Sequence, residues 1–177
     1  NERFSELIVK NSKKDLLKKL NVKDSMGADL EKVDVDSIIE FAKQINNLYG
    51  FRTKQVSYLE SEMEIICPNL QAVAGTIVGA KLIRKAGSLK RLMFMAASTI
   101  QVLGAEKALF RHMITGAKSP RHGLIFNHQL ISMAKQSERG KRARNLADKI
   151  SIAVKVDYFK GKFIGDKLRK GLDEKFK

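Results

Sequence analysis

The spacing of hydrophobic residues predicts helices along nearly the whole chain. The clearest pattern covers residues 37–67, where apolar positions recur at alternating intervals of four and three. That interval is the heptad pattern of coiled coils. The row consists of Ile38, Ala42, Ile45, Tyr49, Val56, Leu59, Met63 and Ile66, with one charged interruption at Arg52. We predict a helix of about 30 residues, roughly 45 Å long, which begins after an N-cap at Asp34 or Asp36.

Shorter helical patterns stand on both sides of this row. Residues 3–20 predict one helix or two short ones, and the turn-forming residues of 21–36 predict a connection. Beyond Pro68, Asn69 is a candidate cap for a helix over residues 70–86 that Gly87 ends. Ser88 and Ser98 are candidate caps for helices over residues 89–95 and 99–103.

The C-terminal half continues the helical pattern. Helices are predicted over residues 105–114, 138–158 and 161–177. Basic residues and Pro120 make residues 117–122 an exposed loop, and the apolar residues 123–126 predict a buried re-entry of the chain. The core face of the helix at 138–158 is predicted to contain Ala143, Leu146, Ala147, Ile150 and Val154.

We therefore predict an all-α protein with two parts, a coiled-coil helical arm at residues 1–67 and a compact basic helical domain at residues 68–177. The first helical segment is too short to cover the long row of the second. The rest of that row must pack on the basic domain or on a second copy of the chain. The candidate dimer residues are Ile45, Tyr49, Val56, Leu59 and Met63.

Charge is distributed unevenly between these two parts. Residues 1–70 contain 11 basic and 12 acidic side chains, whereas residues 81–144 contain 14 basic side chains and only Glu106 and Glu138 as acids. A solvated surface seldom needs such an excess of one sign. The basic part is therefore expected to bind a polyanion.

Motifs for catalysis and for metal binding are missing from the sequence. The phosphate-binding pattern GxxxxGK[ST] and the GxSxG turn do not occur. Cys67 is a single cysteine, which suits a half-buried thiol in a reducing compartment. His112 lies on an apolar helix face and is expected to be a core residue. We expect no enzymatic activity, no cofactor and no metal site.

Two kinds of group that bind RNA occur together in residues 102–144. Cations hold phosphates without regard to sequence, and unpaired bases are recognised by stacking and by contacts to their edges. The candidate phosphate ligands are Lys107, Arg111, Lys118, Arg121, Arg139, Lys141, Arg142 and Arg144. The candidate base contacts are His122, Asn127 and His128, whereas Phe126 is assigned to the core. For His128, the alternatives are stacking on an unpaired base and capping of the segment that follows.

Several segments resemble the Nop domain, which is found in the scaffold proteins of box C/D guide ribonucleoproteins and in a spliceosomal relative. The most specific segments are GAEKALFR at residues 104–111 and TGAKSPRHGLIFNH at residues 115–128. AGSLKRLMFMAASTIQVL at 86–103, PNLQAVAG at 68–75 and SMGADL at 25–30 fit the same family. The spliceosomal relative lacks the GAEKALFR pattern in this form and is the second choice within the family.

This resemblance implies a function for the basic domain. Family members are non-catalytic scaffolds that recognise a kink-turn RNA together with a small kink-turn-binding protein of ribosomal type. They position a fibrillarin-type methyltransferase for guide-directed 2′-O-methylation of RNA, and their long helical hairpin mediates self-association. The fibrillarin-binding N-terminal domain of the family is not in this chain, so we expect RNA binding without recruitment of the enzyme. The absence of a charged low-complexity tail favours an archaeal, cytoplasmic protein over a nucleolar one.

Two functions outside this family remain open from the residues alone. A DNA-binding helical regulator with a coiled-coil dimer arm would have the same charge pattern. A protein adaptor would bind no nucleic acid in a salt-dependent way.

Overall fold

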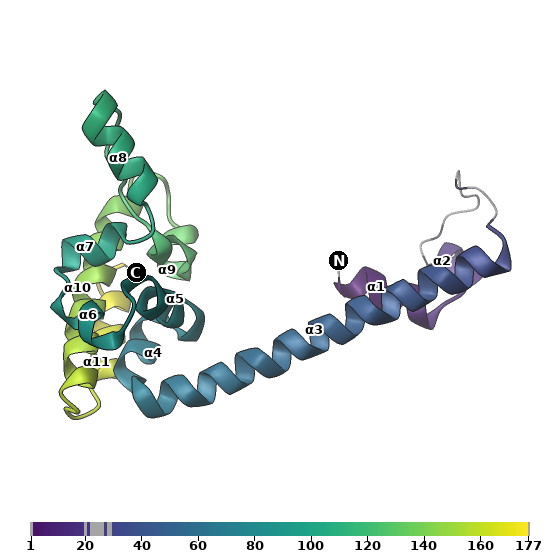
Figure 1. Ribbon diagram of the computed structural model, residues 1–177, viewed down its shortest axis with the longest axis horizontal. Helices are drawn as coiled ribbons and strands as arrows, with labels where there is room; N and C mark the ends of the chain where they lie inside the picture. The colour runs from purple at the N-terminus through teal and green to yellow at the C-terminus, as the bar shows by residue number, and fades with distance from the viewer. Residues whose placement is uncertain (1, 20, 22–26, 28–29, 177) are drawn as a thin grey trace. The chain divides into compact units, whose positions relative to one another are not determined.

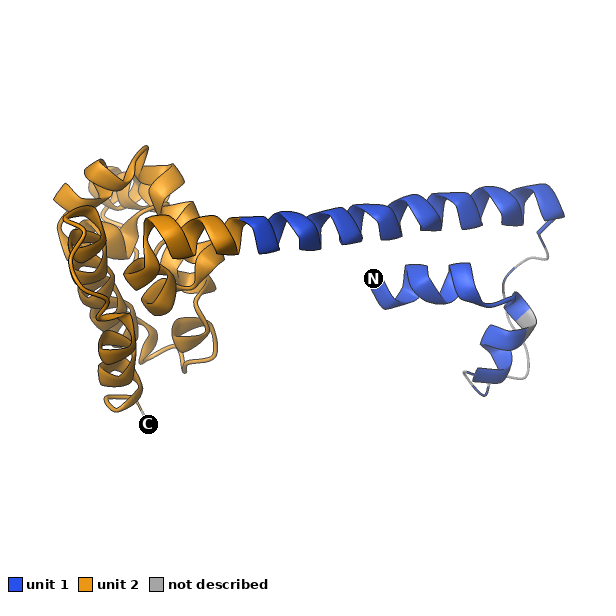
Figure 2. Ribbon diagram, turned by 90° about the horizontal axis from the view of Figure 1, so that it is seen from below, with its two compact units in different colours: residues 1–58 blue, residues 59–177 orange. Residues whose placement is uncertain are grey.

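The computed structural model describes residues 2–19, 21, 27 and 30–176, and within these residues every regular element is a helix (Figure 1). The predicted all-α class is therefore confirmed. The chain divides into two compact units, residues 1–58 and residues 59–177 (Figure 2). This division falls inside the long helix, whereas the sequence analysis placed the end of the arm at residue 67. Residues 22–26, 28 and 29 of the predicted connection, and with them most of the SMGADL segment, lie outside the described residues.

Unit 1 contains two short helices and the first part of a long one. The short helices are α1 (Glu2–Lys10) and α2 (Lys13–Lys19), and the long one is α3 (Lys32–Ile66). Because α3 already begins at Lys32, the prediction that Asp34 or Asp36 caps it is wrong. Asp34 instead lies in the first turn, where the positive end of the helix dipole favours an acidic side chain.

Packing in unit 1 covers one face of α3. The buried Ser5 hydroxyl of α1 donates a hydrogen bond of 2.7 Å to Asn46 Oδ1 of α3. Ala42, one turn earlier in α3, is also buried. Ile45 and Tyr49 are half-buried and belong to this covered face.

A second apolar row of α3 is exposed, and the sequence analysis missed it. It consists of Phe41, Leu48, Phe51 and Tyr58, whose exposed fractions are 69%, 67%, 60% and 62%. Their spacings of seven, three and seven place them along one side of the helix. The exposed apolar surface of α3 therefore includes this second row, whereas Ile45, Tyr49 and Val56 of the predicted row are half-buried.

The last turns of α3 belong to the core of unit 2. Met63 is 5% exposed and Leu59 packs against the same hydrophobic core. Gly79 provides the space for Met63, because a Cβ atom on Gly79 would lie 2.8 Å from the Met63 Cε atom. The assignment of Met63 and Leu59 to a dimer contact is therefore wrong, since both are used within the chain.

Gly75 interrupts the helix that was predicted over residues 70–86. The structure has α4 (Pro68–Ala74) and α5 (Thr76–Ala86), with Gly75 between them at φ +75°, a conformation that only glycine adopts freely. Asn69 is not the cap, because α4 begins with Pro68 in its first position. Gly87 ends α5 in the left-handed region at φ +92°, as predicted.

Short helices follow, and their caps were only partly predictable. Ser88 caps α6 (Leu89–Phe94) by accepting a hydrogen bond of 3.1 Å from the Arg91 amide, which confirms that prediction. Ser98 does not cap α7 (Ala97–Val102), which already begins one residue earlier. The remaining elements are α8 (Glu106–Thr115), the 3₁₀ helix η1 (Leu124–Asn127), α9 (Gln129–Ser132), α10 (Arg139–Tyr158) and α11 (Gly165–Asp173).

Helix α10 is the centre of unit 2. It packs against α4, α6, α7, α9, α11 and η1. Its predicted core face is confirmed, because Ala143, Leu146, Ala147, Ile150 and Val154 are all buried. The middle of α10 therefore forms the centre of the core, and the two ends of the helix make different contacts.

The buried carboxylate of Asp157 fastens the C-terminal end of α10 to its neighbours. It accepts hydrogen bonds from the Asn69 amide at 3.1 Å, from Asn69 Nδ2 at 2.7 Å and from the Leu70 amide at 2.8 Å. Asn69 Oδ1 in turn accepts a bond of 2.6 Å from the Ile164 amide, just before α11. One acidic side chain thus binds the start of α4 and, through Asn69, the entry to α11.

Replacing Asp157 with Ala should reduce the free energy of unfolding by about 2–3 kcal/mol, because buried donors at the start of α4 lose their charged acceptor. The measurement is urea denaturation followed by circular dichroism. Asp148→Ala, at an exposed position of the same helix, is the matched control and should be nearly neutral. Equal losses for the two variants would contradict a special role for Asp157.

Candidate nucleic-acid interface

A cationic hollow lies at the N-terminal end of α10, beside the loop at residues 117–122. The cavity has a volume of about 580 Å³. Three exposed cations line it, Arg121 from the loop and Lys141 and Arg144 from α10. The other lining residues are Gln101, Ser119, Pro120, Ser137, Gly140 and Asn145. We call this cavity the cationic hollow.

The position of the loop follows from a close approach of two backbone segments. The Gly123 amide donates a hydrogen bond of 2.8 Å to the Gln101 carbonyl, and the Leu124 amide donates one of 2.8 Å to the Leu103 carbonyl. A Cβ atom on Gly123 would lie only 2.1 Å from the Leu103 carbonyl oxygen, so only glycine fits there. The loop therefore returns to the core directly beside α7, and residues 123–126 form the predicted buried re-entry with Ile125 at its centre.

A helix N-terminus favours anions at this place. The first turn of α10 contains no acidic residue, and Glu138, which precedes it, makes no side-chain cap. The free amide groups and the dipole of a long helix add to the positive charge of Lys141 and Arg144. Phosphate oxygens match such a site in charge and in hydrogen-bonding capacity.

Two of the predicted phosphate ligands already have partners within the chain. The Arg142 guanidinium binds Glu138 Oε2 at 2.9 and 3.2 Å and lies 5.1 Å from the centre of the Phe176 ring. Arg139 Nε donates a hydrogen bond of 3.0 Å to the Ala134 carbonyl. The guanidinium groups of Arg139 and Arg142 are therefore half-buried and already make contacts within the chain.

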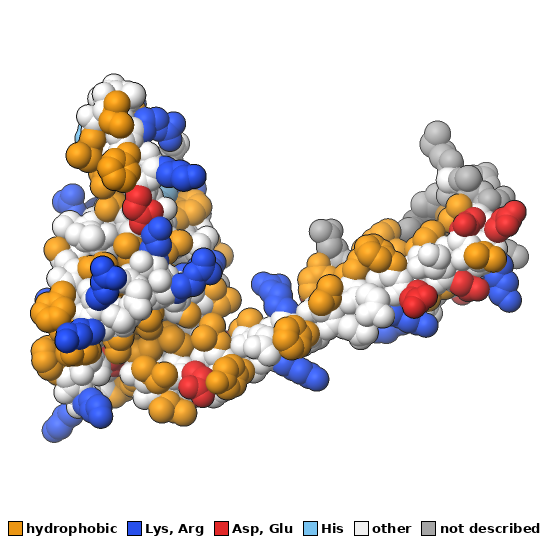
Figure 3. Space-filling view, in the orientation of Figure 1, with side chains coloured by type: hydrophobic (Ala, Val, Ile, Leu, Met, Phe, Trp, Pro, Cys, Tyr) orange, Lys and Arg blue, Asp and Glu red, His pale blue; other side chains and the backbone are white. Residues whose placement is uncertain are grey.

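Helix α8 carries two further predicted ligands at some distance from the cationic hollow. Lys107 and Arg111 are exposed there, and no residue of α8 is buried. Figure 3 shows Lys and Arg side chains on one side of α8 and hydrophobic side chains on the other. His112 is half-buried and its Nδ1 contacts the Ala117 carbonyl, so the prediction of a core histidine is wrong. Lys118 is exposed on the loop.

His122 is the predicted base contact that lies nearest to the cationic hollow, next to Arg121 in the loop. Its ring stacks on Phe126, with centroids 4.7 Å apart and planes 18° from parallel. Burial, followed by the positive charges of Arg139 and Arg121, lowers the pKa of His122. The imidazole is therefore neutral at physiological pH, and Phe126 packs against the core as predicted.

His128 has a structural role in this conformation. Its Nδ1 accepts a hydrogen bond of 3.2 Å from the Leu130 amide and so caps α9, which is the alternative that the sequence left open. Burial, followed by the charge of Arg169, lowers the pKa of His128 despite a hydrogen bond with the Val73 backbone. Asn127 is exposed but lines a separate cavity of about 380 Å³ together with His128 and Arg169. Neither Asn127 nor His128 lines the cationic hollow.

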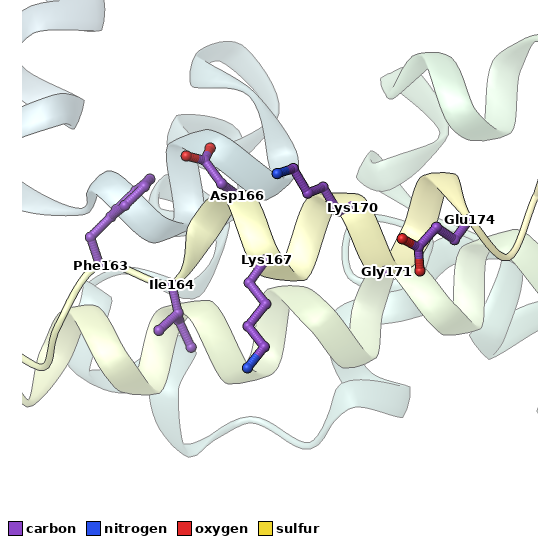
Figure 4. A pocket seen from close by; sticks show the side chains of 7 residues that line it. All are labelled: Phe163, Ile164, Asp166, Lys167, Lys170, Gly171 and Glu174. Atoms are coloured by element: carbon purple, nitrogen blue, oxygen red, sulfur yellow. The ribbon is translucent and has the colours of Figure 1, made fainter.

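A larger cavity, of about 650 Å³, runs along α11 and has a different character. Figure 4 shows Asp166 and Lys170 on one edge of α11 and Lys167 on the opposite edge. Acidic and basic side chains alternate here, so the one-sided positive charge of the cationic hollow is missing. In the part of the chain that the structure describes, no cluster of three or more His, Cys, Asp or Glu side chains could hold a metal ion. None of the described helices is long and apolar enough to cross a lipid bilayer.

The chain belongs to the Nop family. The model of that family, described as "snoRNA binding domain, fibrillarin", matches residues 2–177. The residues of the cationic hollow fall within this match. The resemblance inferred from GAEKALFR and the neighbouring segments is thus confirmed.

Individual relatives give the same assignment. The chain is 48% identical over 153 residues to an uncharacterised NOP5 family protein of Methanocaldococcus jannaschii, covering 86% of this chain and 37% of that protein. It is 45% identical to nucleolar protein 56 of Dictyostelium discoideum, covering 77% of this chain and 25% of that protein. A solved NOP5P structure, in complex with fibrillarin, is similar at 30% identity and a TM-score of 0.60, covering 99% of this chain and 63% of that one. The chain therefore spans 37% and 25% of the lengths of these two relatives and 63% of the solved NOP5P chain.

The two perturbed histidines predict a pH dependence of folding. Because the folded-state pKa values of His122 and His128 lie below the unfolded value, the folded state binds fewer protons. The free energy of unfolding should therefore be constant above about pH 7 and fall as the pH decreases below about 6.5. Denaturant titrations between about pH 7.5 and 5.5, above the range in which carboxylates titrate, measure it.

The variant His128→Asn isolates the contribution of one ring. Asn is a good N-cap residue and keeps an acceptor for the Leu130 amide, but it does not titrate. The fall of stability toward acidic pH should become shallower in this variant. An unchanged fall would show that His128 does not contribute.

Proposed function

We propose that this chain is an RNA-binding scaffold segment of a box C/D guide ribonucleoprotein, which directs 2′-O-methylation of RNA. The observation that carries the proposal is the cationic hollow. It unites Arg121 with Lys141 and Arg144 at the positive end of the central helix, within the residues that match the Nop family model. The hollow takes phosphates of a kink-turn RNA, which a small kink-turn-binding protein of ribosomal type holds in its bent form.

The scaffold is proposed to be non-catalytic. The family profile and the similarity to nucleolar protein 56 support a structural role. The similarity to a NOP5P chain in complex with fibrillarin supports a methyltransferase of that type as the enzyme of the assembly. The protein would act in the cytoplasm of an archaeon, or in the nucleolus if its source is eukaryotic.

The His122 ring is proposed to contact an unpaired base beside these phosphates. It is neutral, held in place by Phe126 and adjacent in sequence to Arg121, which lines the cationic hollow. A flat ring of this kind stacks on any base, because every base has an apolar face. Lys118, Lys107 and Arg111 are exposed and extend the positive surface from the loop onto α8.

A competition experiment tests this function against DNA binding and against a pure adaptor role. The chain should bind a kink-turn RNA more tightly than a duplex DNA of equal length at every salt concentration, and more tightly still when the kink-turn-binding protein is present. Equal affinity for the two nucleic acids would favour a DNA-binding regulator. Binding that is absent at low salt would favour a protein adaptor.

The double substitution Lys141→Ala with Arg144→Ala should flatten the dependence of log K on log salt by about 1.4–1.8, because two phosphate contacts are lost. Electrophoretic mobility shifts with kink-turn RNA at several salt concentrations provide the slope. A control with the same change of net charge is Lys155→Ala with Lys170→Ala, at exposed positions that do not line the hollow. If both double variants change the slope equally, the hollow is not the phosphate site.

The exposed row of Phe41, Leu48, Phe51 and Tyr58 is proposed to mediate self-association. Exposed apolar patches are typical of interfaces. Leu48→Asp should lower the mass measured by light scattering to that of a monomer and leave RNA binding by unit 2 intact. Lys43→Asp, on the same exposed helix, is the control for the added acid. A parent chain that is monomeric at high concentration would remove this proposal.

A further inference from the structure

The loop at residues 117–122 is held by several independent contacts within the chain. At its start, the Ala117 carbonyl contacts His112 Nδ1. Near its end, Gln101 Nε2 donates a hydrogen bond of 2.7 Å to the Arg121 carbonyl, and the Gln101 carbonyl accepts one of 2.8 Å from the Gly123 amide. The side chain of Gln101 therefore fixes the backbone of Arg121, the loop residue that lines the cationic hollow.

Three side chains form a stacked column beneath the same loop. The Arg139 guanidinium lies 5.3 Å from the centre of the Phe126 ring, and the Phe126 ring lies 4.7 Å from that of His122. Arg139 is itself fastened by its bond of 3.0 Å to the Ala134 carbonyl. We call this set the Arg139–Phe126–His122 column. It ties the loop to the first turn of α10.

The side chain of Arg121 also lies against the first turn of α10. A Cβ atom on Gly140 would be in ordinary contact with the Arg121 Cδ atom, at 3.5 Å. The aliphatic part of Arg121 thus lies over the start of α10, close to Lys141. The loop and the start of α10 therefore form one surface, on which the positively charged side chains of the cationic hollow lie close together.

We propose that Gln101 and Arg139 are positioning residues, which promote RNA binding by holding the loop in its RNA-binding shape. This inference rests on the proposed RNA-binding function of the cationic hollow. Three cations that converge on one hollow repel one another, and a free loop would move Arg121 away. A loop that is already ordered binds more tightly, because its ordering cost is met by the fold and not by the ligand.

The proposal changes the role of Arg139 from that predicted by its sequence position. A phosphate ligand and a positioning residue both weaken binding when they are replaced. They differ in salt dependence, because only a phosphate contact releases counterions. The two kinds of residue also differ in their effect on the protein without RNA. Only the replacement of a positioning residue changes how often the loop opens.

The first experiment uses Gln101→Met, which keeps the length of the side chain and removes its amide. In the full chain without RNA, trypsin should cleave after Lys118 and Arg121 faster than in the parent, while cleavage after Lys155 and Lys170 stays the same. The affinity for kink-turn RNA should fall roughly fivefold to tenfold, the equivalent of one hydrogen bond, with an unchanged salt slope. Gln136→Met, at an exposed position after α9, is the control and should change neither measurement.

The second experiment examines the column. Arg139→Gln should weaken RNA binding with an unchanged salt slope and should speed cleavage of the loop. Phe126→Leu removes the ring that both Arg139 and His122 contact. It should likewise weaken RNA binding and speed cleavage of the loop. Phe126→Tyr, which keeps that ring, should retain the parent behaviour in both measurements.

The outcomes separate this inference from the proposed function. If the parent chain binds no RNA, the proposed function fails, and the cleavage rates alone decide whether Gln101 and Arg139 order the loop. If Arg139→Gln flattens the salt slope by about 0.7–0.9, as the loss of one phosphate contact would, Arg139 is a direct ligand and the inference is overturned. Equal acceleration of cleavage at all four sites would mean general destabilisation and would overturn it as well.

Discussion

The carboxylate of Asp157 is the interaction on which the arrangement of unit 2 depends. Burying a charge without partners is very costly, and this carboxylate avoids that cost by accepting three hydrogen bonds at the start of α4. Because α10 packs against six other elements, fixing its C-terminal end also fixes the direction in which its N-terminal end points. The cationic hollow is located at that free end. Asp157 therefore acts on the candidate interface only through the rigidity of α10. Burial and, to a smaller extent, the negative charge of Asp157 raise the pKa of Cys67 to about 11. The thiol therefore remains protonated.

The fold was predictable where one residue type decides the local structure. Gly87 and Ser88 behaved as predicted, because a left-handed turn and an amide-accepting hydroxyl each depend on a single side chain. Gly75 was missed because a helix that ends and restarts within one residue leaves the hydrophobic period almost intact. The role of Asp157 could not be predicted at all. Its partners Asn69 and Leu70 lie 88 and 87 residues earlier in the chain, and no local pattern connects them.

The candidate site was predictable in its charge but not in its geometry. The excess of cations in residues 81–144 indicated the part of the chain that contains most of the cationic hollow. It did not show that Arg142 is paired with Glu138 or that His128 faces the start of α9. The same limit applied to α3. Its heptad row was identified from the sequence, yet Met63 belongs to the core of unit 2 and the exposed row contains Phe41 and Leu48. A periodic pattern shows that a face is apolar, whereas only the fold shows what covers it.

Helix geometry explains why four basic residues in α10 form two pairs with different surroundings. Residues three apart lie on one side of a helix, so Arg139 and Arg142 share one direction, and Lys141 and Arg144 share another. The first pair faces aromatic rings, Phe126 and Phe176 respectively, and each guanidinium has a hydrogen-bond partner within the chain. The second pair faces the cationic hollow and is exposed. A planar guanidinium can stack on a ring and donate hydrogen bonds at its edge at the same time, which a lysine ammonium cannot do. The two arginines that face rings therefore build the surface, and the lysine and arginine that face solvent supply its free positive charge.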